Sequence, residues 1–199
     1  MRYRTTFLIV LAALAASGAA LPATAQDDPL AACADLLAGY TPILGTSSHP
    51  TPVGLSLPAA RQAWLDPTFG TCLVRVTDRL SDFDTPLPGL KNEYSRVQAF
   101  NADETLIMLR SVEGDWLLYD ARTLAPIQKI EGPTAIDEPR WDVRDPHRFS
   151  YSLWVDGLPQ IMTADLVPRG DGFDVRATLA HDFAGELPPE WNATFVWRR

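Results

Sequence analysis

Two short segments carry the side chains that are best suited to hold a ligand. Tyr94 and Arg96 stand just ahead of one apolar run, and Glu138 and Arg140 stand just ahead of a later one. A guanidinium can grip a carboxylate or phosphate through two parallel hydrogen bonds, and a tyrosine ring can stack on a sugar. Salt bridges inside the protein, for example from Arg140 to Glu138 or Asp142, are the alternative use of these charges. We therefore predict a ligand-binding site at Tyr94, Arg96, Glu138 and Arg140, and leave that alternative open.

Sequence motifs for catalysis are absent from this chain. It contains no phosphate-binding loop, no G-x-S-x-G nucleophile elbow and no H-E-x-x-H zinc motif. The histidines, His49, His147 and His181, are far apart, and none has the spacing of a metal ligand. His181 and Asp182 can act as a base and its partner, although a polar pair at a strand end is the simpler interpretation. We predict no catalytic residue, no metal ligand and no cofactor.

A polar loop from Asp78 to Leu90 offers a further group of oxygen ligands. Asp78, Asp82 and Asp84 carry the carboxylates that calcium prefers. Their spacing departs from the D-x-D-x-D-G order of a calcium-binding loop. We therefore expect solvated side chains at these three positions.

The first 25 residues have the features of a secretory signal peptide. Arg2 and Arg4 precede the apolar run Phe7–Ala16, and Ala23–Ala25 provides an A-x-A cleavage site. The apolar run is too short, and too rich in small residues at its end, for a good membrane span. We predict export to the periplasm or the extracellular space, and no membrane span elsewhere in the chain.

The charge and the cysteines of the chain limit its partners and its compartment. With 17 basic and 25 acidic residues the net charge is −8, which argues against nucleic acids and anionic membranes as partners. The two cysteines, Cys33 and Cys72, can form a disulfide in an exported protein. Two buried thiols are the alternative, and the sequence does not choose between them.

The segment that follows the signal peptide is predicted to be helical at first and then rich in proline and glycine. The pattern Asp27–Tyr40 is helical, because Asp28 can cap it and Pro29 suits the first helical position. Gly39 can end this helix. An irregular stretch follows, and Ala59–Leu65 suits one more short helical turn.

From residue 66 onward, alternating apolar residues and turn residues predict short strands. The turn Asn101–Glu104 separates the strands Val97–Phe100 and Thr105–Ser111, and Asp120–Thr123 and Arg169–Gly172 are further turns. Ala164–Asp165 follows a strand that we expect to end at Thr163. The other strands that we expect are Thr71–Thr77, Trp116–Tyr119, Pro126–Ile130, Phe149–Trp154, Pro159–Thr163 and Phe173–Leu179.

These strands repeat along the chain. Phe100 matches Trp141 and Asp120 matches Asp165, at spacings within the roughly 40–50 residues that are typical of propeller repeats. Each repeat contains four strands in succession. We therefore predict an all-β fold of antiparallel four-stranded repeats with a short N-terminal helix. A plain β-meander or sandwich is the alternative.

Four stretches carry a resemblance to a known class of proteins. They are DPTFGTCLVRVTD, EYSRVQAFNADETLIML, WLLYD and EPRWDVRDPHRFSYSLW, and the resemblance extends from Asp66 to Leu166. This order resembles secreted bacterial β-propeller proteins of the TolB-like, WD40-like class, in which a polar N-x-D-x turn precedes a strand and a short lyD-like tail ends the next. The resemblance implies a partial β-propeller of two blades over residues 66–199. These repeats follow the predicted signal peptide, residues 1–25, and the helical and Pro/Gly-rich segment, residues 26–65. Because a closed propeller needs roughly four to eight blades, we expect this sequence to be a fragment.

Propellers serve many functions, so the fold class alone does not set one. The missing catalytic motifs favour a secreted binding or scaffold module for a protein or a glycan. The alternative is a fragment of an extracellular carbohydrate-active enzyme, similar to the polysaccharide lyases that are built on propellers. Copies of the chain can also associate through their edge strands.

Overall fold

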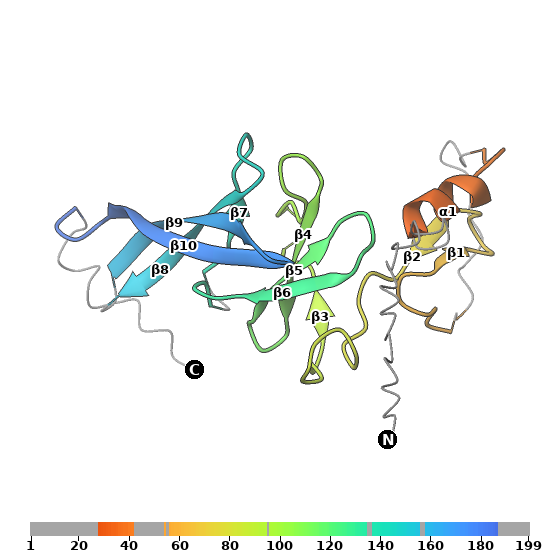
Figure 1. The fold of residues 1–199 in the computed structure, drawn as a ribbon, viewed down its shortest axis with the longest axis horizontal. Coiled ribbons are helices and arrows are strands. Elements are labelled where there is room, and N and C mark those ends of the chain that lie inside the picture. Colours follow the sequence, from red (N-terminus) through yellow and green to blue (C-terminus); the bar gives the residue numbers. More distant parts are fainter. Residues whose placement is uncertain are drawn as a thin grey trace, which may run out of the picture.

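The computed structural model describes residues 28–41, 54, 56–94, 96–134, 137–155 and 158–186. This part of the chain forms one helix and ten strands, which are labelled in Figure 1. Two antiparallel sheets of four strands make up most of it, and a two-stranded sheet precedes them. The predicted antiparallel four-stranded sheets and short N-terminal helix are therefore confirmed. The predicted signal peptide, residues 1–25, lies outside the described residues.

The helix α1 (Pro29–Leu36) begins where the sequence predicts a cap. Oδ1 of Asp28 accepts hydrogen bonds from the backbone N–H groups of Leu30 and Ala31, at 3.0 and 3.1 Å. These bonds satisfy donors that have no partner within the first turn of a helix. The helix is shorter than the predicted span, and Gly39 follows it with φ at +85°. Among the described residues, no helix is long and apolar enough to cross a membrane.

Residues 63–74 form a hairpin, which takes the place of the helical turn that we expected at Ala59–Leu65. Strands β1 (Ala63–Leu65) and β2 (Cys72–Val74) pair in antiparallel fashion. Between them, Oδ1 of Asp66 accepts from the backbone N–H groups of Thr68 and Phe69 and closes a tight turn. The helical interpretation was wrong because it overlooked this turn, which brings a β-partner within reach of the backbone of Ala63–Leu65.

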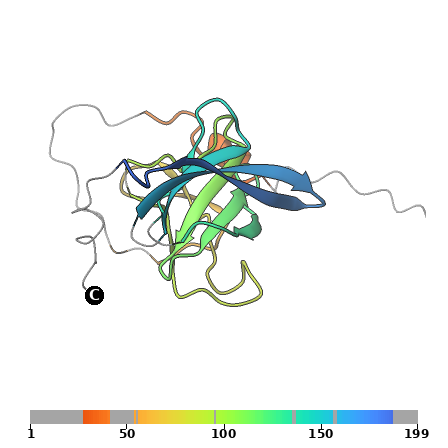
Figure 2. The ribbon, with the colours of Figure 1, turned by 90° about the vertical axis from the view of Figure 1, so that its left-hand side faces the viewer.

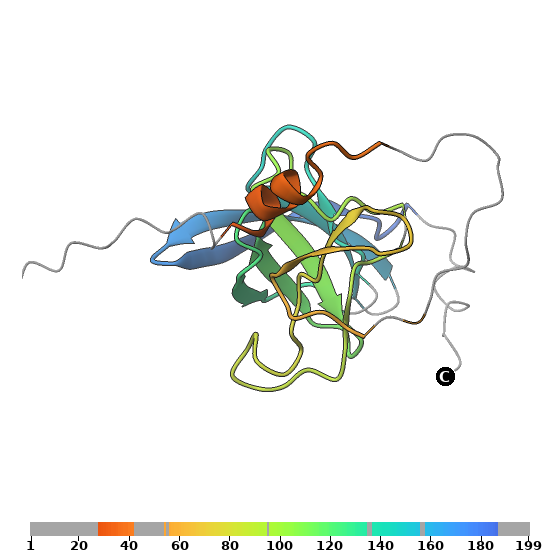
Figure 3. The same ribbon diagram turned by 90° about the vertical axis from the view of Figure 1, so that its right-hand side faces the viewer.

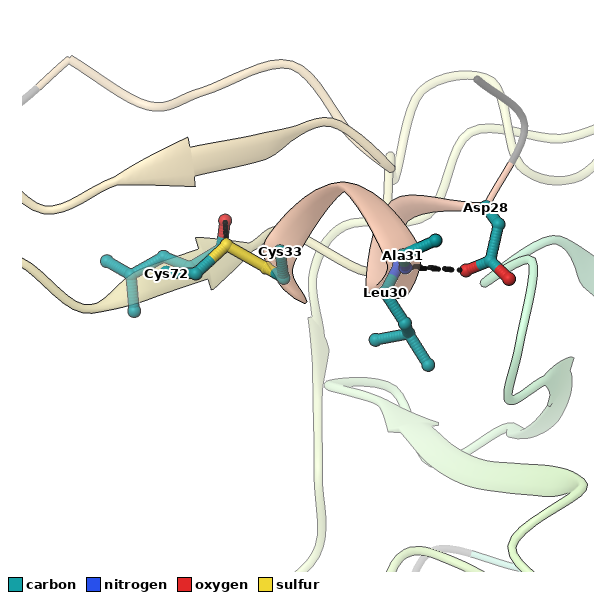
Figure 4. The surroundings of a disulfide bond; sticks show 6 residues. Asp28, Leu30, Ala31, Cys33 and Cys72 are labelled. Carbon is teal, nitrogen blue, oxygen red and sulfur yellow. Dashed lines mark hydrogen bonds between the residues drawn. A yellow bond between two sulfur atoms is a disulfide. The ribbon is translucent and has the colours of Figure 1, made fainter. Parts of the chain in front are cut away.

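A disulfide joins α1 to this hairpin. Cys33 and Cys72 are bonded, as Figure 4 shows, and their Cα atoms are 5.5 Å apart. That separation is typical of disulfides in proteins. Disulfides persist mainly in oxidising compartments, so the bond indicates a place outside the reducing cytosol.

The first four-stranded sheet differs from prediction at its first strand. The predicted strand Val97–Phe100 was wrong except for a single bridge from Phe100 to Ile107. A turn closed by the hydrogen bond from the N–H of Val97 to the carbonyl of Tyr94, at 2.8 Å, interrupts the extended backbone there. In order, the strands are β3 (Leu90–Lys91), β4 (Leu106–Ser111), β5 (Trp116–Asp120) and β6 (Pro126–Ile130).

The second four-stranded sheet has three long strands and one short edge strand. It contains β7 (Arg140–Trp141), β8 (Arg148–Val155), β9 (Leu158–Arg169) and β10 (Gly172–Asp182), which again pair in the order of the sequence.

The predicted end of a strand at Thr163 was wrong, because β9 continues through Ala164–Asp165 to Arg169. Asp120 ends a strand because its Oδ1 accepts from two backbone N–H groups and one hydroxyl of the residues that follow it. Asp165 lies in the middle of β9, and its carboxylate accepts a hydrogen bond from Nε of Arg148 at 2.7 Å. The match between the two aspartates therefore does not extend to their structural roles.

The two four-stranded sheets pack face to face and share one core. Figure 2 views the molecule from the side of the second sheet, and Figure 3 from the side of α1. Alternate residues of β4 and β5 point to opposite faces, as the pleat requires. The core between the sheets contains Leu106, Met108, Trp116, Leu118, Ile130, Phe149, Tyr151, Ala164 and Leu166. The opposite face of the first sheet buries Ile107, Leu109, Leu117 and Tyr119 against Val74, Val76, Phe83 and Leu87.

Candidate functional site

The four predicted ligand-binding residues line one pocket, which we call the arginine pocket. It has a volume of about 500 Å³ and is lined by Tyr94, Arg96, Glu138 and Arg140. Tyr94 and Arg96 come from the turn that follows β3, Glu138 precedes β7, and Arg140 begins it. The structure thus brings together two segments that are distant in sequence.

The charges of the arginine pocket are accessible to solvent. Nη2 of Arg140 lies 2.9 Å from Oε2 of Glu138, and their side chains are 51% and 56% exposed. The salt bridge that the sequence left open is therefore formed, within one segment. The guanidinium of Arg96 lies 5.2 Å from the centre of the Tyr94 ring, and no salt bridge to Arg96 is found among the described residues. Because exposed ion pairs contribute little, an anionic ligand can replace Glu138 at small cost.

A largely buried ion pair supports the first side of the arginine pocket. Glu93, which precedes Tyr94, binds Arg110 of β4 at 3.0 Å, and their side chains are only 13% and 17% exposed. The guanidinium of Arg110 lies 5.9 Å from the centre of the Trp116 ring. The position of the Tyr94 segment is thereby tied to the first sheet.

A hydrogen-bonded chain supports the second side. Nε1 of Trp116 donates to the carbonyl of Thr134 at 2.8 Å, and the N–H of Thr134 donates to the buried carboxylate of Asp137. The carbonyl of Asp137 accepts from the N–H of Ser152 on β8 at 2.9 Å. Glu138 follows directly with φ at +41°, a conformation that a residue other than glycine rarely adopts. The surrounding contacts must therefore hold this backbone in place.

Trp116 supports both sides of the arginine pocket and was not among the residues predicted to form the site. Its ring contacts Arg110 on one side and its indole N–H binds Thr134 on the other. Asp137 stands with Glu138 and Arg140 among the polar residues ahead of β7, but it was not predicted to be a site residue. The only local signal for it is an acid placed directly before the Glu138–Pro139 pair that leads into β7.

The two histidines that the structure describes, His147 and His181, have different partners. Nε2 of His181 lies 3.1 Å from Glu186, and Asp182 instead accepts from Gln160. The ring of His147 packs at 5.7 Å against that of Phe173. His49 lies outside the described residues.

The acid-rich loop was wrongly expected to be fully solvated, because Asp82 is buried. Its carboxylate forms an ion pair with Arg61, accepts from the N–H of Asp78 at 2.7 Å, and accepts from the hydroxyl of Tyr119 at 3.0 Å. The predicted solvation holds for Asp84, which is exposed. In the described part of the chain, no three histidine, cysteine or acidic side chains gather in a way that could hold a metal ion.

Comparisons with protein-family models, with curated proteins and with solved structures find no match to this chain.

Proposed function

We propose that this chain is an exported, non-catalytic module of the β-propeller type that binds a glycan or protein ligand in the arginine pocket. The observation that carries this proposal is that Tyr94, Arg96, Glu138 and Arg140 line a single pocket although they come from two distant segments.

The arrangement of the sheets supports a propeller-type architecture. Two successive four-stranded sheets, each with its strands in sequence order, stack face to face through a shared core. Hydrogen bonds also join them, from Nε1 of Trp141 to the carbonyl of Ala99 and from Nδ2 of Asn101 to that of Pro146, both at 2.9 Å. In a propeller the starts of the inner strands converge near the central axis, where ligands commonly bind. Under this proposal the arginine pocket, which adjoins the turn after β3 and the start of β7, would lie near that axis.

The charges of the pocket indicate the chemistry of its ligand. Two guanidinium groups face one carboxylate, so the pocket has a net positive charge in a chain whose net charge is −8. Arginine can bind a carboxylate or phosphate through two parallel hydrogen bonds. The exposed ring of Tyr94 offers a flat surface on which a sugar can stack. These features favour a ligand that combines an anionic group with a ring.

Calorimetric titration with methyl glucuronide and with neutral methyl glucoside tests the proposal. We expect saturable binding of the acidic glycoside only, and a loss of roughly tenfold or more in the Arg96→Ala/Arg140→Ala variant. The matched control is Arg122→Ala/Arg144→Ala, which removes the same charge from exposed positions outside the pocket.

Equal binding of the two glycosides, or an equal loss in the control variant, would contradict the assigned site. The non-catalytic part of the proposal has its own test. Release of new reducing ends from a polyuronate during incubation with the pure protein would show that the chain is an enzyme.

A further inference from the structure

A second pocket lies at the other end of β5, and the proposed function makes no use of it. Trp116 begins β5 and supports the arginine pocket, whereas Asp120 ends β5 and lines this second pocket, which we call the Asp120 pocket. It has a volume of about 520 Å³. Its lining includes Leu106, Asp120, Ile127, His147, Asp171 and Phe173, which come from both four-stranded sheets.

Part of the lining of the Asp120 pocket is apolar and firmly held. Leu106 is buried in the core between the sheets, and Ile127 and Phe173 pack against that core. The N–H of Phe173 donates to Oε1 of Gln128 at 2.6 Å, and Nε2 of Gln128 donates back to the carbonyl of Phe173 at 3.0 Å. The ring of His147 packs against that of Phe173. A hydrocarbon chain would therefore find a preformed surface here.

The rim of the Asp120 pocket carries negative charge. Asp171 is exposed in the turn between β9 and β10, and Asp120 is half-buried at the end of β5. Burial opposes the ionisation of Asp120, but hydrogen bonds from Thr123 and Arg122 outweigh it and hold the pKa of its carboxyl below the usual value. All the hydrogen bonds that the described residues donate to this carboxylate go to Oδ1. Oδ2 is thus left to bind a ligand.

We propose that the Asp120 pocket binds a lysine side chain of a partner protein. The methylene groups of the lysine would lie on Ile127 and Phe173, and its ammonium group would bind Oδ2 of Asp120. Lysine fits better than arginine, because an ammonium is a compact donor, whereas a guanidinium prefers two carboxylate oxygens at once. Oδ1 of Asp120 already accepts three hydrogen bonds. The net charge of −8 would also attract a basic partner.

The test is an NMR titration of the full chain with Nα-acetyl-lysine methylamide at millimolar concentrations. The matched probe is the norleucine analogue, which has a similar stem and no ammonium. We expect saturable shifts of the backbone amides of Thr105, Gly172 and Phe173 with the lysine probe, and much weaker shifts with norleucine.

Two variants separate the charge from the turn that it supports. Asp120→Asn keeps an oxygen acceptor for the turn and removes the charge, so we expect it to weaken lysine binding roughly tenfold. Asp142→Asn makes the same change in a similar turn, where Oδ1 accepts from the N–H groups of Arg144 and Asp145 outside the pocket. We expect this control to bind the probe as the wild type does.

The proposal is wrong if norleucine binds as tightly as lysine, if Asp142→Asn weakens binding as much as Asp120→Asn, or if no shift saturates. The Arg96→Ala/Arg140→Ala variant should bind the lysine probe normally. The two pockets can therefore fail or succeed independently of each other.

Discussion

The carboxylate of Asp82 connects three parts of the chain that are distant in sequence. It pairs with Arg61 before the hairpin, accepts from the hydroxyl of Tyr119 on β5, and accepts from the N–H of Asp78 in its own loop. Its side chain is 1% exposed, whereas that of Arg61 is 29% exposed. Removing one partner of a buried pair leaves the other charge without compensation, which is costly.

We expect Asp82→Asn to lower the free energy of unfolding by about 3 kcal/mol in urea titrations monitored by tryptophan fluorescence. Asp84→Asn is the matched control, because it removes the same charge from an exposed position in the same loop. A similar loss in both variants would show that the acidic loop acts through its total charge and not through the Asp82 contacts.

Tyr119 gives the stability a defined dependence on pH. Burial, followed by the hydrogen bond to Asp82, raises the pKa of Tyr119 well above its usual value near 10. Its contribution is complete below the pKa of the unfolded chain and is lost as the pH rises toward the higher folded value. We expect the stability advantage of the wild type over Tyr119→Phe to shrink between about pH 8 and about pH 10.5 in urea titrations. An advantage that stays constant would mean that the hydroxyl titrates alike in both states.

At the scale of elements, the disulfide fixes α1 to the β1–β2 hairpin across 39 residues of sequence. Closing a loop of this length reduces the entropy of the unfolded chain. We expect Cys33→Ser/Cys72→Ser to unfold at lower urea concentration, with a loss of about 3 kcal/mol. Both four-stranded sheets should keep their NMR chemical shifts, because their shared core contains neither cysteine.

Chemical reduction provides the control for this prediction. A reducing agent should destabilise the wild type by the same amount and leave the double serine variant unchanged, since the chain contains two cysteines in total. Loss of the chemical shifts of both four-stranded sheets in the double variant would show instead that their folding depends on the bond.

The strands that were predicted correctly are those in which periodicity and turn chemistry agree. β4 and β5 are apolar runs joined by Glu113–Asp115, where Gly114 has φ at +106°. Two of the failures share a physical cause, which is that a strand depends on a partner that the local sequence does not show. Ala63–Leu65 becomes a strand because β2 lies beside it, and β9 runs through Asp165 because β8 and β10 pair with it on both sides.

The exposed residues of the candidate site could be predicted from the sequence. The buried residues that hold them in position could not. Tyr94, Arg96, Glu138 and Arg140 were identified because they occupy matching positions ahead of apolar runs. Trp116 and Asp137 act through contacts with residues separated from them in sequence or through backbone groups, and neither kind of contact leaves a motif in the sequence.

At the scale of the whole molecule, the two four-stranded sheets are joined by more than apolar packing. Asn101 is 3% exposed, and its Oδ1 accepts from the N–H groups of Thr105 and Leu106 at the start of β4. Its Nδ2 donates to the carbonyl of Pro146, in the turn between β7 and β8. One side chain therefore closes a turn in the first sheet and binds the second sheet.

This double role predicts how the molecule unfolds. We expect Asn101→Ala to lower the free energy of unfolding by about 2–3 kcal/mol, since it leaves buried backbone groups without partners. Asp142 occupies the matching turn of the second sheet and binds only local N–H groups among the described residues. Asp142→Ala should therefore lower the free energy of unfolding by less. Urea titrations that follow one NMR resonance in each sheet measure both variants.

The wild type should show one transition for both sheets, because they share a core. Separate transitions in the wild type, or an equal loss in the two variants, would mean that each sheet folds by itself and that the Asn101 bond does not couple them.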